Sequence, residues 1–277
     1  MREISIAAIS SLITLTLSIA GHADDRESFE AFPSSNGEIA SFIYFHQDGV
    51  YFIDTDLSAS IQAIRYKRFF FSVDLYEETY MGRKYHSNMV FDPNRGGWSF
   101  GISGRLEFKR YFVEAQMHHN CFHDIGRWMS IDYSVYWNTP RLGIGSIGFL
   151  PQNKYHQPNA AKTDVYFPNK IDYFILAGFF APRGEVWQKN HDQEFALETD
   201  LFYQLLRFKR FGLNIESNNF WVLNAAHDLK RKHALDFDLT IYGKNGVIMA
   251  YIGWWPYDSQ SIRNRDGKTV FGMRLGF

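Results

Sequence analysis

The sequence predicts an all-β fold, namely a closed antiparallel transmembrane β-barrel of twelve strands, with fourteen as the alternative count. Three observations predict it. Apolar and polar residues alternate with a period of two from about residue 38 onward, as half-buried strands require. Tight turns join these strands on one side, and longer polar segments join them on the other. This asymmetry is typical of barrels that cross a membrane, where closure leaves no unpaired sheet edge in the lipid.

The composition excludes several other classes of protein. The chain has 277 residues, a net charge of −1, 18% aromatic residues and one cysteine, with a mean hydropathy of −0.29. The balanced charge argues against a general nucleic-acid binder, which needs clustered lysine and arginine. Cys121 alone cannot form an intramolecular disulfide. Beyond the N-terminus no apolar run reaches roughly 20 residues, so a bundle of membrane-spanning helices is excluded.

The N-terminal segment predicts export. It carries Arg2, an apolar stretch over Ile4–Ala20 and small residues at Gly21 and Ala23, which is the layout of a secretory signal peptide. A membrane anchor is the alternative for this segment. We therefore expect a signal peptide at 1–23, a lead-in at 24–37 and the barrel domain at 38–277.

Strand alternation is clear in several segments. In the first of them, Val73 and Leu75 face one side, while Asp74 and Glu78 face the other. A secreted soluble β-sandwich also alternates, but here the polar faces carry carboxylates and arginines that can pair with one another in an interior. The segments are Phe69–Glu78, Gly97–Phe108, Tyr111–Asn120, Met129–Trp137, Phe195–Leu205, Phe211–Ser217 and His233–Ile241.

Three of the tight turns share one pattern, aromatic-Lys-Arg-aromatic. Aromatic rings gather at membrane interfaces, and lysine and arginine extend from there towards the headgroups. We therefore interpret these residues as membrane-interface anchors: Tyr66, Lys67, Arg68, Phe69, Phe108, Lys109, Arg110, Tyr111, Phe208, Lys209, Arg210 and Phe211.

Two further tight turns are expected at Thr139-Pro140-Arg141 and at Lys244-Asn245-Gly246, where the Asn-Gly pair favours a hairpin. With these turns the count is twelve strands, and 151–193 is one long external excursion with its own hairpin. A sixth turn at Ala181-Pro182-Arg183-Gly184 would give fourteen strands. The longer connections on the opposite side are expected at 79–96, 121–127, 151–168, 223–232 and 256–267.

The last strand, Thr269–Phe277, alternates Phe271, Met273 and Leu275 outward and ends on Phe277. It resembles the C-terminal strand of outer-membrane β-barrel proteins of Gram-negative bacteria, in which a terminal aromatic residue belongs to the signal read by the barrel-assembly machinery. The resemblance implies residence in the bacterial outer membrane, with Phe277 as the assembly signal. It also implies outer-membrane lipids and the barrel-assembly machinery as partners. We expect no cofactor and no nucleic-acid partner, and the oligomeric state stays open.

Strand parity places a set of polar residues inside the barrel. They form either a structural network of paired charges or the lining of a narrow, porin-like channel for small solutes, in which carboxylates favour cations. The sequence leaves both interpretations open. The predicted lumen-lining residues are Asp74, Arg105, Glu114, Gln116, Asp132, Glu198, Asp200, Asn214, Glu216, Asp236, Asp238 and Arg274.

A second candidate site is the segment His118–Asp124, at the loop end of one strand. Histidine beside a carboxylate suits general-base or metal chemistry, and a cysteine beside a histidine can act as a nucleophile. The candidate catalytic residues are His119, Cys121, His123 and Asp124. No metal-ligand set is assigned.

This segment loosely resembles the active-site strand of outer-membrane phospholipase A, in which a histidine near an asparagine stands two residues before a serine and a Gly-Arg pair follows. His119 matches that histidine. Cys121 stands where the serine is expected, and Gly126-Arg127 lies several residues later. The resemblance implies lipid hydrolysis, with the nucleophile changed from a hydroxyl to a thiol.

We expect an outer-membrane barrel with a carboxylate-rich lumen, which acts as a structural barrel or as a narrow channel for small solutes. Enzymatic activity is the weaker interpretation. One alternative is an outer-membrane lipid hydrolase that uses His118–Asp124. Others are a transition-metal site at His119 and His123, or a polar strand end whose histidines are only hydrogen-bonded. The last is a barrel that binds partners through its long external loops.

Overall fold

The computed structural model describes residues 29–47, 50–82, 92–124, 134–154, 165–168, 170–180, 188–189, 192–260 and 264–277. The expected signal peptide, Asp132 and the turn expected at 181–184 lie outside the described residues. Within the described ranges, no helix is long and apolar enough to span a membrane.

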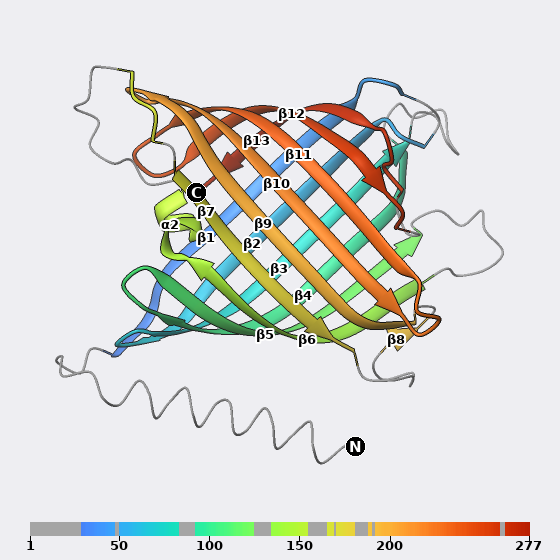
Figure 1. The fold of residues 1–277 in the computed structure, drawn as a ribbon, viewed down its shortest axis with the longest axis horizontal. Helices are drawn as coiled ribbons and strands as arrows, with labels where there is room; N and C mark the ends of the chain where they lie inside the picture. Colours follow the sequence, from blue (N-terminus) through green and yellow to red (C-terminus); the bar gives the residue numbers. More distant parts are fainter. Residues whose placement is uncertain are drawn as a thin grey trace, which may run out of the picture.

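The chain forms a closed barrel of antiparallel strands (Figure 1). Neighbours in sequence pair with each other around the ring, and β1 pairs with β13 to join the two ends of the sheet. The ring contains twelve strands, which confirms the predicted fold class and count. They are β1 (Phe29–Tyr44), β2 (Ile53–Tyr66), β3 (Phe69–Gly82), β4 (Asp92–Glu107), β5 (Tyr111–Asp124), β6 (Ser134–Ser146), β7 (Lys170–Phe179), β9 (Gln193–Phe208), β10 (Phe211–Asn224), β11 (Leu229–Tyr242), β12 (Val247–Asp258) and β13 (Thr269–Gly276). The two-residue β8 (Gln188–Lys189) pairs with β6 beyond the end of β7.

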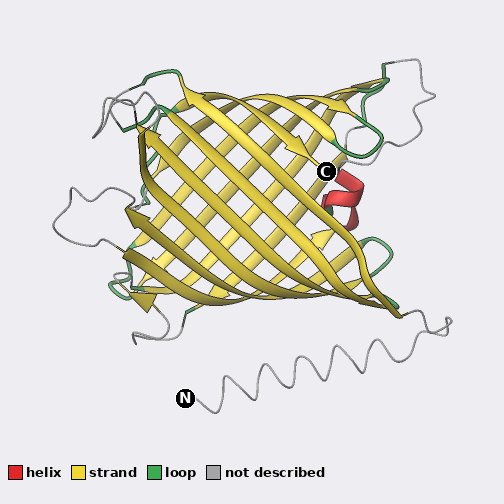
Figure 2. Cartoon of the chain, turned by 180° about the vertical axis from the view of Figure 1, so that it is seen from behind, coloured by secondary structure: helices red, strands yellow, loops and turns green. Residues whose placement is uncertain are grey.

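The tight turns lie at the same end of the barrel as the C-terminus, which we call the short-turn end; the opposite end is the loop end (Figures 1 and 2). The turns expected around 67–68, 109–110, 209–210 and 244–246 are confirmed. Lys67 and Lys209 have φ values of 53° and 50°. Two-residue hairpin loops with a positive φ at their first residue match the twist of the flanking strands. The lysine of both turns has this conformation, so the two strands stay paired up to the turn.

The turn expected at Thr139-Pro140-Arg141 is wrong. Strand β6 continues through Pro140, which pairs with Met117 of β5. On its other side, β6 pairs with β8 at Trp137 and with β7 from Arg141 onward. Pro140 therefore lies in the gap between two ladders, where its missing N–H costs no ladder hydrogen bond.

The external excursion expected at 151–193 is also wrong, because β7 lies within that range and is a barrel strand between β6 and β9. The chain before β7 lies at the short-turn end, where it forms the 3₁₀ turn η1 (Ile147–Phe149) and the one-turn helix α2 (Pro151–Lys154), drawn in red in Figure 2. The β6–β7 connection thus replaces the turn expected at 139–141, and the count of twelve is unchanged.

Several strands run further than expected. Strand β1 begins at Phe29. Residues 29–37, which we assigned to a lead-in, are therefore part of the barrel wall and pair with β2. Three of the connections expected at the loop end are shorter, at 83–91, 225–228 and 259–268, whereas the one expected at 121–127 occupies 125–133.

The outer face is apolar and exposed, whereas charged side chains are buried inside. Asp54 and Asp238 are 0% exposed, but Phe100 is 53% and Leu239 is 53% exposed. A soluble domain buries its apolar side chains and exposes its charged ones. The reverse arrangement seen here is typical of a barrel whose outer surface contacts lipid. The exposed apolar side chains on the strands include Ile39, Leu57, Leu75, Phe100, Ile102, Val113, Leu142, Ile144, Ile175, Leu213, Phe237, Leu239, Ile248, Ile252, Phe271, Met273 and Leu275.

The aromatic-Lys-Arg-aromatic turns lie at the short-turn end. The Lys67 ammonium lies 5.5 Å from the centre of the Tyr66 ring, and the rings of Phe108 and Tyr111 stack with centres 4.6 Å apart. Each turn thus presents rings and cations together, while their role as membrane anchors stays a prediction.

Candidate functional site

The parity of β5 divides the histidine-rich segment between the two faces of the barrel wall. Phe112 is 2% exposed and lies inside, together with Glu114, whose carboxylate accepts a hydrogen bond from Gln116. His118 has the same parity and lies 3.2 Å from the hydroxyl of Ser99 on β4. His119 and Cys121 have the opposite parity and lie on the outer face.

An asparagine that we did not predict orients His119. Asn138 of β6 is the direct cross-strand neighbour of His119. The Nδ1 of His119 lies 2.9 Å from the side-chain oxygen of Asn138. An amide oxygen only accepts hydrogen bonds, so Nδ1 donates, which leaves Nε2 of the neutral ring free to accept a proton.

Cys121 lies on the same outer face, two residues after His119. Its cross-strand neighbours are Trp98 of β4 and Tyr136 of β6, so an aromatic residue stands on each side of the thiol. The Tyr136 ring also contacts the His119 ring, with centres 5.8 Å apart. The thiol is half-buried. In the described residues no hydrogen bond joins His119 to the thiol, although alternate positions of one strand face lie only about 7 Å apart along the backbone.

The depth of Cys121 in the wall follows from its place in β5. It stands ten positions after Tyr111 at the short-turn end and three before Asp124, the last residue of β5. At a rise of about 3.3 Å per residue and a tilt of about 40°, this is roughly 25 Å along the barrel axis, close to the height of an apolar band. Cys121 therefore lies near the upper edge of the apolar surface, at the loop end.

His123, which was also proposed from the sequence, does not join this group. The His123 ring packs against Trp98, with centres 5.6 Å apart, and four residues of strand separate it from His119 by about 13 Å. That spacing does not favour one ion shared by both imidazoles. Asp124 pairs in register with Arg95. No group of three or more metal-binding side chains occurs among the described residues.

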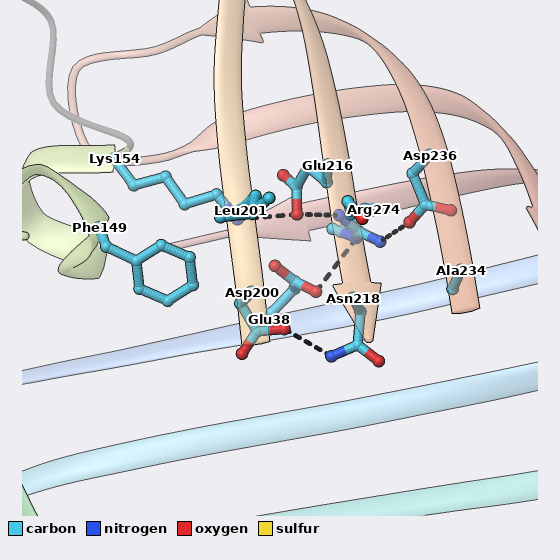
Figure 3. A pocket seen from close by; sticks show the side chains of 11 residues that line it. Glu38, Phe149, Lys154, Asp200, Leu201, Glu216, Asn218, Ala234, Asp236 and Arg274 are labelled. Atoms are coloured by element: carbon cyan, nitrogen blue, oxygen red, sulfur yellow. Dashed lines mark hydrogen bonds and ion pairs between the residues drawn. The ribbon is translucent and has the colours of Figure 1, made fainter. Parts of the chain in front are cut away.

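The lumen is the second candidate site, and there Arg274 of β13 lies among several carboxylates (Figure 3). Its guanidinium lies 3.0 Å from Asp236, 3.1 Å from Glu38 and 3.5 Å from Glu216. These carboxylates come from β11, β1 and β10. One arginine thus links four strands, including the two that close the ring.

Lys154 enters the lumen from α2 at the short-turn end. Its ammonium lies 2.9 Å from Glu216 and within 5.6 Å and 5.0 Å of the ring centres of Phe149 and Phe202. The side chain is 10% exposed. Figure 3 shows it directed towards the group around Arg274, beside a cavity of about 260 Å³ that Asp200 and Asn218 also line.

Apart from Asp132, the remaining residues that we expected inside the lumen lie on the inner face, where most of them contact other polar side chains. Arg105 pairs with Glu107 at 3.0 Å and with Glu114 at 3.8 Å, and Arg141 pairs with Glu198 at 3.5 Å. The amide of Asn218 donates to Asp200. Further hydrogen bonds join Ser103 to Asp74 and Asn214 to Thr240, and Asp238 is fully buried.

A second arginine enters the lumen from the loop end. Arg265, in the β12–β13 connection, donates to Asp54 and to the Tyr44 hydroxyl, at 3.0 Å in each case. Burial alone lowers the pKa of Arg265, but Tyr44 and Asp54 raise it well above its usual value, so the guanidinium stays charged. Cations therefore enter the interior from both ends of the barrel.

Comparisons with known proteins identify no family for this chain. No family model and no curated protein sequence matches it. Among solved structures, it is similar to the outer membrane phospholipase A from Escherichia coli, at 8% identity and a TM-score of 0.49, over 88% of this chain and 92% of that chain. The Salmonella typhi outer membrane phospholipase dimer with bound calcium has 8% identity and a TM-score of 0.49, over 95% and 96% of the chains. The translocator domain of the autotransporter NalP from Neisseria meningitidis has 10% identity and a TM-score of 0.37, over 98% and 96%. Identities this low concern the barrel fold alone.

Proposed function

We propose that this protein is an outer-membrane enzyme that cleaves acyl esters of membrane lipids, with Cys121 as the nucleophile, His119 as the general base and Asn138 as the residue that positions the imidazole. The observation that carries the proposal is the 2.9 Å contact between His119 Nδ1 and the Asn138 oxygen, with Cys121 on the same outer face. The proposal takes up the lipid hydrolase that the sequence left as an alternative to a structural or channel-forming barrel, and it adds Asn138 to the candidate residues.

The chemistry has two steps. Nε2 of His119 takes the proton of the Cys121 thiol as sulfur attacks the ester carbonyl carbon. The carbon–oxygen bond of the ester breaks, the leaving alcohol takes the proton from His119, and the acyl group remains on sulfur as a thioester. Water then attacks the thioester, releases a fatty acid and restores the thiol. The hydrogen bond between His119 and Cys121 is expected to form when substrate is bound, as is common for catalytic contacts.

The outer wall supports a lipid as the substrate. Below Cys121, the same face of β4–β6 exposes Phe100, Ile102 and Leu142. An acyl chain lying along these side chains would place its ester carbonyl at the height of Cys121.

Residence in the outer membrane is part of the proposal. Support comes from the exposed apolar wall, from the aromatic-Lys-Arg-aromatic turns and from the outward alternation of β13 up to Phe277. We likewise propose that outer-membrane lipids and the barrel-assembly machinery are its partners. The signal peptide at 1–23 stays a prediction from the sequence.

The test is release of labelled fatty acid from phosphatidylcholine by the refolded full-length barrel in detergent micelles. We expect Cys121→Ala and His119→Ala to lower the rate by about a hundredfold or more, and Asn138→Ala by about tenfold because the ring loses its orientation. Since the chain has one cysteine, alkylation with N-ethylmaleimide should inactivate it as completely as Cys121→Ala does.

His123→Ala is the matched control, because His123 lies on the same face of β5 but packs against Trp98. We expect it to retain the wild-type rate. A Cys121→Ala variant as active as the wild type would contradict the proposal.

The interior supports a structural role more than a channel. Lys154 and Arg274 share Glu216 in the middle of the lumen. We therefore expect the wild-type barrel to give no conductance steps in a planar lipid bilayer. Regular cation-selective steps would instead support the channel. In that case Lys154→Met should increase the conductance, and Lys170→Met, whose side chain is 61% exposed, should leave it unchanged. Partner binding through the loops stays a prediction, since 83–91, 125–133 and 181–187 lie outside the described residues.

A further inference from the structure

We propose a second catalytic site inside the barrel, which cleaves short acyl esters with Ser99 as the nucleophile, His118 as the general base and Asp74 as the residue that positions the imidazole. The site is independent of the proposed function, because these residues face the lumen and Cys121 faces outward. Three features lead to it: the contacts of the His118 ring, the glycine on which that ring lies, and a side-chain amide without a partner beside Ser99.

The His118 ring contacts a hydroxyl with one nitrogen and faces a carboxylate with the other. Its Nδ1 lies 3.2 Å from the Ser99 hydroxyl, and its Nε2 lies 4.0 Å from Asp74. A carboxylate only accepts hydrogen bonds, so the proton of the neutral ring belongs on Nε2, and the Ser99 hydroxyl donates to Nδ1. Asp74 is itself fixed by the hydroxyl of Ser103, which donates to it at 2.8 Å. The gap between Nε2 and Asp74 is expected to close when substrate is bound, as is common for catalytic contacts.

A glycine allows the imidazole to lie across the neighbouring strand. Gly101 of β4 pairs with Asp74 of β3 on one side and with His118 of β5 on the other, so the three residues form one row across the sheet. A Cβ atom at Gly101 would lie 2.5 Å from the His118 ring, which is closer than side chains approach one another. The missing side chain thus makes the space in which the ring reaches from Ser99 towards Asp74.

Asn120 provides a hydrogen-bond donor that the described part of the fold leaves unused. It is the direct cross-strand neighbour of Ser99 and has the inward parity of His118. Its side-chain nitrogen is buried and has no hydrogen-bond partner among the described residues, which is unfavourable for a buried donor. An amide N–H beside a nucleophile can stabilise the oxyanion that forms from an ester carbonyl. The unused donor therefore points to a ligand with a carbonyl oxygen.

The position of the site selects the substrate. His118 lies half-way along β5, on its inner face. The side chains of His118 and Asp74 are 16% and 22% exposed, so a small molecule inside the lumen can reach them. The strands separate this site from the membrane, so a short, water-soluble ester fits it better than a membrane lipid does.

The reaction needs only the ester and water. Nδ1 of His118 takes the hydroxyl proton as Oγ of Ser99 attacks the carbonyl carbon, and the carbonyl oxygen accepts a hydrogen bond from Asn120. The carbon–oxygen bond of the ester breaks, and the leaving alcohol takes the proton from Nδ1. Water then gives a proton to Nδ1 and attacks the acyl-serine. The acid is released, and Ser99 receives that proton back as its hydroxyl.

The experiment uses the full-length barrel with Cys121→Ala in detergent micelles, so that the outer thiol contributes nothing. Phenylmethylsulfonyl fluoride identifies the nucleophile, because the serine oxygen bonds to its sulfur, fluoride leaves and the hydroxyl proton passes to His118. We expect one sulfonyl group per barrel, located by mass spectrometry on the peptide that contains Ser99. Hydrolysis of p-nitrophenyl acetate should fall in step with this labelling.

Variants in the same background separate the roles. We expect Ser99→Ala and His118→Ala to lower the hydrolysis of p-nitrophenyl acetate by about a hundredfold or more, and Asn120→Ala by about a hundredfold. Asp74→Asn should lower kcat by about tenfold or more and leave KM unchanged, because Asp74 acts through His118 and does not touch the substrate.

Ser60→Ala is the matched control, because Ser60 pairs in register with Asp74 but lies on β2, three strands away from His118. We expect full labelling and full hydrolysis from it, and heat-modified migration on gels checks that each variant is folded. A sulfonyl group on another residue, no label on a folded barrel, or equal losses in Ser60→Ala and Ser99→Ala would overturn the inference. Release of fatty acid by Cys121 is tested separately by N-ethylmaleimide, so either site can fail without the other.

Discussion

Arg274→Met is expected to lower the free energy of unfolding of the barrel by about 3–5 kcal/mol, because it leaves buried carboxylates without their counter-charge. The Arg274 side chain is 12% exposed and pairs with Glu38, Glu216 and Asp236. Methionine fills much of the same volume, so the change removes charge more than packing. Lys154 still neutralises Glu216, but Glu38 and Asp236 lose the cation that holds them together.

Urea unfolding of the refolded barrel in micelles, followed by tryptophan fluorescence and by heat-modified migration on gels, measures the change. Arg65→Met is the matched control, since Arg65 and Glu30 form an ion pair at 3.3 Å that is 42% and 47% exposed. Exposed pairs contribute about 1 kcal/mol or less. Equal losses in the two variants would show that burial of the Arg274 group does not matter.

Arg265→Met is expected to detach the β12–β13 connection from the barrel mouth, at a cost of about 3 kcal/mol to local stability. Asp54 is 0% exposed, and its carboxylate would lose the guanidinium that lies 3.0 Å away while keeping the hydrogen bond from the Tyr44 hydroxyl. The Arg265 guanidinium also lies 5.2 Å from the Trp255 ring and 5.5 Å from the Tyr80 ring. These contacts are lost together with the ion pair.

Limited proteolysis of the folded barrel reports this change, as faster cleavage within 259–268 while the strands stay protected. Arg231→Met serves as the control, because Arg231 also lies at the loop end and against a ring, that of Tyr257, but is exposed. An unchanged cleavage pattern in Arg265→Met would mean that other contacts hold the connection in place.

The alternation of single strands was enough to predict the barrel, because each polar residue of a strand must face one side of the sheet. Asp74, Glu114 and Asp236 follow from this rule alone. Pro140 misled the prediction, since proline usually ends a strand, and the gap between β7 and β8 that tolerates it is a property of the paired sheet. The same error hid β7 and led us to expect residues 151–154, which form α2, at the wrong end of the barrel.

Asn138 shows where sequence reasoning ended in the site. His119 and Cys121 are two residues apart and could be grouped by parity, but Asn138 is nineteen positions away from His119. Its place depends on the register between β5 and β6, which no local pattern specifies. Lys154 was missed for a related reason, because a one-turn helix gives no periodic signal.

The pairing of Glu38 with Arg274 has a consequence for how the barrel assembles. Glu38 lies on the first strand and Arg274 on the last, and the two meet only when β1 and β13 join. In an open sheet Arg274 would still lie beside Asp236 and Glu216, but Glu38 would be separated from it across the open edge. Ring closure therefore completes the neutralisation of this group, which favours the closed barrel over a half-closed one.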